Sequence, residues 1–177
     1  AEAVEAQGER AAAIAKEMGG SGVDGWEGDG HAAAWRHIRD FPWGAGGAAF
    51  GGVAVKVSVL PTDVAKALDG LGGVAREAGV ALRYVAEAGM GVARVALGDR
   101  HLPAGTDPAG LAKGLESVRG QIAQRHGTLV VLEAPAAVKA AMDVWGSVGK
   151  ALDLMKALKA QFDPHGILNP VRFVGGI

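Results

Sequence analysis

The stretch GVAVKVSVLPTD, residues 52–63, contains the clearest secondary-structure signal in the chain. Valines recur at every second position from Val53 to Val59, and Lys56 and Ser58 fall between them. This alternation predicts a strand with one buried face and one polar face. Thr62, which follows a proline, is predicted to be the N-cap of a helix. The fold is therefore expected to start with a strand that leads directly into a helix.

Outward from this stretch, apolar periodicity predicts five further elements. They are a helix over 64–78, strands over 81–88 and 91–97 joined by a tight turn, a helix capped by Asp107, and a strand over 128–133. The order strand, helix, strand, strand, helix, strand is the split βαβ, or ferredoxin-like, arrangement. We therefore expect an α+β fold: one antiparallel sheet with helices on one face, and core strands near 53–60, 81–88, 91–97 and 128–133.

The sheet face that lies away from the helices is predicted to be partly polar. It carries Lys56 and Ser58, and Arg94 joins them if the register of the strands permits. Such a face is either a binding surface or an ordinary solvated face, and the sequence pattern leaves both interpretations open.

Two further parts flank this core of residues 52–134. Residues 1–51 are expected to be largely helical, with helices over 1–18 and 31–40 and with GDGH at 28–31 as a loop. Residues 135–177 are expected to form C-terminal helices and a tail. The helix predicted over 148–161 has an apolar face expected to be buried, made of Val148, Leu152, Met155 and Leu158. We expect residues 1–177 to form a single domain.

The composition argues against several classes of function. A net charge of -1 argues against nucleic-acid binding, which needs a basic face, and the lack of cysteine excludes disulfides and thiol catalysis. No apolar run is long enough for a transmembrane segment. The five histidines show none of the spacings of metal motifs, so we expect no metal site.

The C-terminal sequence KAQFDPHGILNPVRFVGG, residues 159–176, is apolar and rich in turn residues. The preceding helix is expected to stop before Asp163-Pro164, because a residue before proline is disfavoured in the helical region. Gly166 permits one turn, and Asn169-Pro170 forces another. We expect the tail from Phe162 to Phe173 to be ordered, with its apolar residues packed on its own domain.

This tail resembles the ending K-x-x-F-D-P-x-G-I-L-N-P-G-R of FAD-linked oxidases of the vanillyl-alcohol-oxidase type. The matching residues are Lys159, Phe162-Asp163-Pro164, Gly166-Ile167-Leu168-Asn169-Pro170 and Arg172. Val171 replaces the last glycine of that pattern, so a positive φ at this position would strain the valine. Asp143-Val144-Trp145-Gly146 and Trp35-x-x-Ile38-Arg39-Asp40 are similar to the small flavin subunit of bacterial glycolate oxidase, the GlcE type.

The resemblance implies a C-terminal cap domain that covers the flavin and the substrate in a FAD-dependent oxidoreductase. The implied reaction removes hydride from the α-carbon of a small 2-hydroxy acid, glycolate giving glyoxylate. The family's FAD-binding domain would precede residue 1, so we expect this chain neither to bind FAD with useful affinity nor to be active alone. The implied partners are the larger flavin subunit and the iron–sulfur subunit of glycolate oxidase. The implied location is the cytoplasm, or the inner face of the membrane through those partners.

Four residues are candidates for the site that the resemblance implies. Lys56 and Arg94 are candidates for binding the substrate carboxylate, and Asn169 and Arg172 for contacts near the flavin. Each also has a structural interpretation, as a solvated strand residue, a turn former or a surface charge. Two other functions stay open: a non-catalytic structural or electron-relay domain that binds partner flavin and iron–sulfur subunits, and a free-standing ferredoxin-like ligand sensor.

Overall fold

The computed structural model describes residues 2–22, 25–26, 28–44 and 50–177, and the chain forms two compact units, Ala1–Asp40 and Phe41–Ile177. The first unit holds two helices, α1 (Glu2–Glu17) and α2 (Gly28–Arg39). The loop predicted at 28–31 is wrong, because these residues form the first turn of α2. Asp29 lies in that turn, where a carboxylate interacts favourably with the helix dipole.

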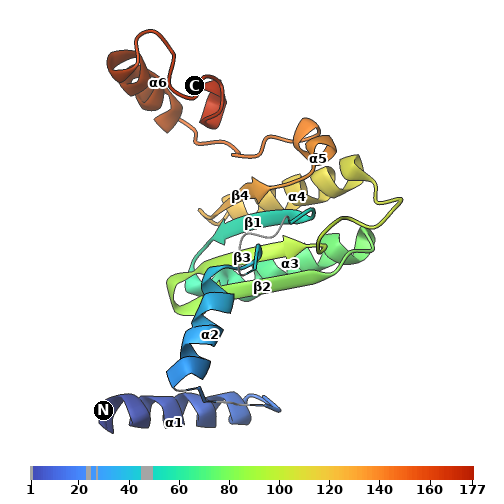
Figure 1. Cartoon of the computed structure of the whole chain (residues 1–177). Helices are drawn as coiled ribbons and strands as arrows, with labels where there is room; N and C mark the ends of the chain where they lie inside the picture. The colour runs from blue at the N-terminus through green and yellow to red at the C-terminus, as the bar shows by residue number, and fades with distance from the viewer. Residues whose placement is uncertain (1, 23–24, 27, 45–49) are drawn as a thin grey trace. The chain divides into compact units, whose positions relative to one another are not determined.

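The second unit is built on a four-stranded antiparallel sheet (Figure 1). Its strands are β1 (Val53–Ser58), β2 (Leu82–Glu87), β3 (Val92–Leu97) and β4 (Thr128–Glu133). Their order across the sheet is β2-β3-β1-β4, and every neighbouring pair is antiparallel. The predicted ferredoxin-like α+β fold is thereby confirmed.

Helices α3 (Val64–Glu77) and α4 (Pro108–Ala123) pack together on one face of this sheet. The valines of β1 at 53, 55 and 57 point into the core between the helices and the sheet, as their alternation predicts. Leu71 of α3 and Leu115 of α4 lie in the same core and are fully buried. Burial of these side chains provides the main driving force for folding of this unit.

The two predicted helix caps have different outcomes. Asp107 caps α4 as predicted, since its carboxylate accepts the backbone N–H groups of Ala109 and Gly110, each at 3.0 Å. Thr62 is not the cap of α3, because Pro61–Asp63 forms a 3-10 turn and Asp63 stands at the N-cap position. The Asp63 side chain makes no capping bond and instead pairs with Arg125 at 3.0 Å.

The C-terminal part consists of α5 (Ala136–Ala140), α6 (Ala151–Phe162) and a last 3-10 turn, Val174–Gly176. The prediction that the apolar face of α6 is buried is wrong in part. Leu152 and Met155 are half-buried, Leu158 is exposed, and α6 has no fully buried residue. Among the described helices, none has the length and apolarity needed to cross a membrane.

Candidate functional site

The tail that follows α6 is held against the end of this helix by a polar clamp, formed by Lys159 and Asp163. The Asp163 carboxylate is 8% exposed and accepts the backbone N–H groups of Ile167 and Leu168, each at 3.0 Å. The ammonium group of Lys159 lies 2.6 Å from the Asp163 carboxylate and donates to the Leu168 carbonyl at 2.5 Å. One helical turn of α6 thereby fixes the path of the chain from 163 to 168.

The clamp also changes the acidity of Asp163. The hydrogen bond from Lys159 holds the pKa of this carboxyl below its usual range, and the backbone N–H groups of Leu168 and Ile167 lower it further. Partial burial acts in the opposite direction but does not prevail. Asp163 is therefore ionised at neutral pH, as the clamp requires.

The clamp should open only in acid. Because the pKa of Asp163 is lower in the folded state, its contribution to stability is fully present above the unfolded value of about 3.9. It is lost as the pH falls through the folded value, which lies below that. We expect the amide chemical shifts of Ile167 and Leu168 to stay constant from pH 7 to about pH 5 and to change only below about pH 4. A titration of these two amides midway near pH 6 would contradict the clamp.

Between Asp163 and Arg172, the turns of the tail require left-handed backbone at three positions. Gly166, Asn169 and Val171 have φ values of 61°, 45° and 56°. Glycine has no penalty in this region and asparagine tolerates it, but a β-branched residue does not. The strain predicted for valine at position 171 is therefore confirmed. The bond from the Arg172 N–H to the Asn169 carbonyl, at 3.2 Å, closes the strained turn.

Replacement of Val171 by glycine should therefore stabilise this turn. The strain removed is roughly 1–2 kcal/mol, and the extra freedom of glycine in the unfolded chain offsets roughly half of it. We expect slower hydrogen exchange at the Arg172 amide, by a few-fold. V171A keeps a β-carbon and should give a smaller change, while faster exchange in V171G than in the parent chain would contradict the strain.

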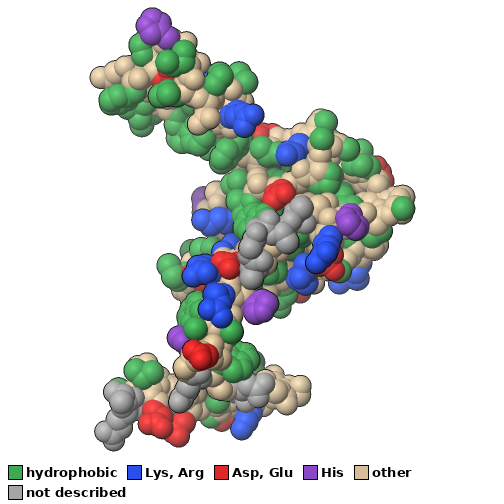
Figure 2. All heavy atoms as spheres, in the orientation of Figure 1, with side chains coloured by type: hydrophobic (Ala, Val, Ile, Leu, Met, Phe, Trp, Pro, Cys, Tyr) green, Lys and Arg blue, Asp and Glu red, His purple; other side chains and the backbone are tan. Residues whose placement is uncertain are grey.

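The apolar residues of this segment face outward, contrary to the prediction that they pack on their own domain. The exposed side chains are those of Leu154, Leu158, Phe162, Ile167, Leu168, Val171 and Phe173, with Phe162 at 77%. Figure 2 shows hydrophobic side chains over the surface of this region, at the top of the view. The physical reason is that the clamp turns the tail back onto α6 itself, so the sheet does not cover it.

A pocket of about 580 Å³ opens on this surface, between α6 and the returning tail. Met155, Leu158 and Phe173 supply apolar lining, and the candidates Asn169 and Arg172 line it as well. The structure thus brings these two predicted flavin contacts together, and both are exposed. The pocket combines an apolar surface with hydrogen-bond donors, which suits a flat, partly polar ring.

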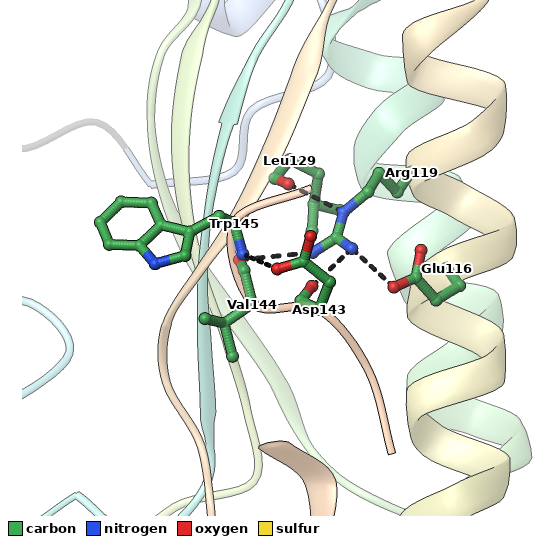
Figure 3. Close-up of polar contacts among 6 residues, drawn as sticks. All are labelled: Glu116, Arg119, Leu129, Asp143, Val144 and Trp145. Carbon is green, nitrogen blue, oxygen red and sulfur yellow. Dashed lines mark hydrogen bonds and ion pairs between the residues drawn. The ribbon is translucent and has the colours of Figure 1, made fainter. Parts of the chain in front are cut away.

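The segment that leads to α6 is attached to the core by Arg119 of α4 (Figure 3). The guanidinium donates to the carbonyls of Leu129, Asp143 and Val144 at 3.0, 2.7 and 3.4 Å, and it pairs with Glu116 at 2.6 Å. The Val144 carbonyl also accepts the backbone N–H of Val131 on β4, at 2.8 Å. Arg119 therefore joins a helix, a strand and a loop through main-chain atoms.

Two residues of the Asp143-Val144-Trp145-Gly146 sequence complete this junction. Gly146 has a φ of 76°, and a β-carbon there would lie 3.2 Å from the Arg119 side chain, so glycine suits both the backbone and the space. The ring of Trp145 meets that of Phe173 edge to face, with 5.3 Å between centroids. This contact, with buried Val174, joins the end of the tail to the junction.

The other two candidates lie together on the open face of the sheet. Lys56 and Arg94 are register partners on β1 and β3, so their side chains are neighbours, Lys56 exposed and Arg94 half-buried. Next to them on this face, Phe50 covers Ala54 and Ala96, with Phe41 and Trp43 packed against them. The open face is therefore part apolar and covered, and part cationic.

The structure joins the predicted site residues as two pairs, Lys56 with Arg94 and Asn169 with Arg172. Sequence reasoning missed Arg119, whose signal is an arginine inside the apolar stripe of α4. The ion pair of Lys159 with Asp163 was also not predicted, although their spacing of four residues places both on one side of a helix. Within the described ranges, no group of histidine or acidic side chains could hold a metal ion.

Comparison with known families locates one similarity in this part of the chain. Residues 145–172 match the family described as FAD linked oxidases, C-terminal domain. The matched segment runs from the Arg119 junction through α6 and the clamp to Arg172, and the ferredoxin-like sheet lies outside it. No curated protein matches the chain. The match supports the FAD-linked oxidase C-terminal domain family, whose full-length members are FAD-dependent oxidoreductases.

Proposed function

We propose that this chain is the C-terminal cap of a FAD-dependent oxidoreductase that oxidises a small 2-hydroxy acid, glycolate to glyoxylate, together with a larger flavin subunit and an iron–sulfur subunit. The observation that carries the proposal is that the family match covers the α6–tail segment and its clamp. The family match supports an FAD-linked oxidoreductase and does not identify its substrate. The substrate and the partners rest on the resemblance of the sequence.

The residues present fit one wall of a flavin site and not the whole site. The pocket of α6 and the tail offers an apolar surface beside Asn169 and Arg172. The helices α3 and α4 both begin at an aspartate, Asp63 and Asp107, which disfavours an anionic pyrophosphate at either N-terminus. The dinucleotide would therefore be held mainly by another domain, with this chain against its ring end.

Lys56 and Arg94 would supply the charge for the substrate. A 2-hydroxy acid carries a carboxylate, and two neighbouring cations on an open sheet face suit that group better than one does. Bound FAD would accept the hydride; the protein would orient the acid and stabilise its charge. The exposed apolar side chains of α6 and the tail would face the flavin-binding domain.

The proposal is tested on the complete protein, by anaerobic addition of glycolate to the purified enzyme and measurement of the flavin absorbance. We expect a yellow protein whose flavin is bleached by glycolate, and weaker bleaching with K56L and R94L, which lack the cations. Flavin that is bound but not reduced by any small 2-hydroxy acid would favour the non-catalytic, electron-relay alternative.

The 177-residue chain alone is the control for the part of the flavin site that, on this proposal, another domain supplies. In a calorimetric titration with FAD it should bind more weakly than on the order of 1 μM, which corresponds to about -8.2 kcal/mol. Loss of most contacts leaves the cost of immobilising the ligand unchanged, which explains the weak binding. Tighter binding would place a cofactor site within this chain and contradict the proposed division of roles.

A further inference from the structure

The two edge strands of the sheet, β2 and β4, differ in whether the chain itself provides hydrogen-bond partners for their outer sides. At the β4 edge, the backbone N–H of Val131 donates to the Val144 carbonyl at 2.8 Å, so the chain closes this edge itself. At the other edge, β2 pairs only with β3, and no main-chain bond joins its outer side to the rest of the described chain. An open edge strand is a template for pairing with another strand.

The hydrogen-bonding pattern between β2 and β3 decides which main-chain N–H and C=O groups of β2 point away from the sheet. The Gly98 N–H donates to the Ala81 carbonyl at 2.7 Å, so these two residues form a hydrogen-bonded pair of the antiparallel ladder. Such pairs alternate along a ladder, so every second residue of β2 after Ala81 turns its N–H and C=O toward β3. The main-chain groups of Leu82, Tyr84 and Ala86 therefore point away from the sheet.

We propose that β2 of a second copy of this chain pairs antiparallel with this edge, about a two-fold axis at Val85. Tyr84 then lies opposite the partner's Ala86, and both present outward N–H and C=O groups. The pairing therefore makes hydrogen bonds with no change of backbone, and the two sheets become continuous. A two-fold contact of this kind is self-complementary, as closed dimers require.

The charges on β2 select this register. Arg83, Val85 and Glu87 all lie on the open face, since they pair with Ala96, Arg94 and Val92 of β3. About an axis at Val85, Arg83 faces the partner's Glu87, and Glu87 faces the partner's Arg83. These are non-hydrogen-bonded pairs, in which Cα atoms lie only about 4.5 Å apart and side chains interact closely.

Neighbouring registers lose this complementarity. An axis at Arg83 sets two arginines against each other, and an axis at Glu87 sets two glutamates against each other. An axis at Tyr84 or Ala86 leaves both charges without a partner of opposite sign. Arg83 also pairs with Asp99 of its own chain and is half exposed, so it is held near the edge before association. On the helix face, the Tyr84 ring is 52% exposed, and the pairing places it over the partner's Ala86.

The first test is sedimentation of the 177-residue chain. We expect a dimer at tens of micromolar, a monomer for E87R, which sets arginines opposite each other, and a dimer for the matched control E77R on α3. R83E should also be monomeric, and a mixture of R83E with E87R should form a dimer because the charges again complement. A monomeric parent chain at 100 μM, or an E87R variant that stays dimeric, would overturn the proposal.

The second test fixes the register and uses the natural lack of cysteine. In V85C the two thiols meet on the axis at a Cα separation that a disulfide spans. In Y84C the two thiols are diagonal neighbours roughly 7–8 Å apart at Cα, which is beyond that range. We expect mild oxidation to link V85C chains at least about tenfold faster than Y84C chains; equal rates would overturn the register.

Discussion

Replacement of Arg119 by methionine is expected to lower the free energy of unfolding of the Phe41–Ile177 unit by about 3 kcal/mol. The change removes the donors for three main-chain carbonyls, those of Leu129, Asp143 and Val144. The side chain of Arg119 is only 10% exposed, so little water is at hand to replace it. Urea unfolding followed by circular dichroism measures the loss, provided that the m-value is unchanged.

Two variants separate the role of the planar Arg119 guanidinium, with its several N–H donors, from the role of its positive charge. R119K keeps the charge but has a single ammonium in place of the planar fork that reaches three carbonyls, so most of the loss should remain. E116Q removes only the half-exposed ion pair at 2.6 Å and should cost less than about 1 kcal/mol. A loss below about 1 kcal/mol for R119M would show that the junction is held by other contacts.

Replacement of Asp163 by alanine is expected to release the tail from α6 without unfolding the sheet. The variant loses the acceptor for the amides of Ile167 and Leu168 and the partner of Lys159. Each hydrogen bond shifts a local equilibrium by roughly five- to tenfold, so hydrogen exchange of these two amides should accelerate by on the order of tenfold or more. Exchange in β1 and β3 should not change.

Asp153, an exposed carboxylate on the same helix, provides the matched control. D153A removes the same charge from the first turn of α6 and should leave the amides of the tail unchanged. Under the proposed function, D163A in the complete protein should also slow the reduction of flavin by glycolate more than D153A does, because the pocket lined by Asn169 and Arg172 loses the tail as one of its sides. Protected tail amides in D163A would contradict the clamp.

The sheet could be predicted because its signals are local. Alternation in β1 reports a half-buried strand with no knowledge of its neighbours, and Asp107 before Pro108 marks a helix start. The order of elements then leaves few topologies, of which the ferredoxin-like one is confirmed. The prediction of Thr62 as the N-cap was wrong because Asp63 occupies that position, where its side chain pairs with Arg125, a residue distant in sequence.

The C-terminal site could be predicted only as a sequence of turns. Gly166 and Asn169-Pro170 predicted turns, and the strain at Val171 followed from the valine that replaces a glycine; the left-handed φ values of Gly166 and Asn169 came from the structure. The direction of the tail could not be derived from the sequence. The tail turns back onto α6 because the Asp163 carboxylate accepts the amides of Ile167 and Leu168, and without these hydrogen bonds it could have covered the sheet instead. Its apolar residues were therefore expected inside, and they lie outside.

By itself, the sequence determined the four strands, the antiparallel sheet with its helices on one face, and the positions where the tail must bend. These are properties of neighbours along the chain: side-chain period, cap residues and backbone freedom. Only the tertiary structure decided that Arg119 holds the 143–146 segment, that Lys56 stands beside Arg94, and that the α6–tail surface stays open. Each of these depends on register or on contacts between residues far apart in sequence, where a shift of one residue changes the face of every side chain.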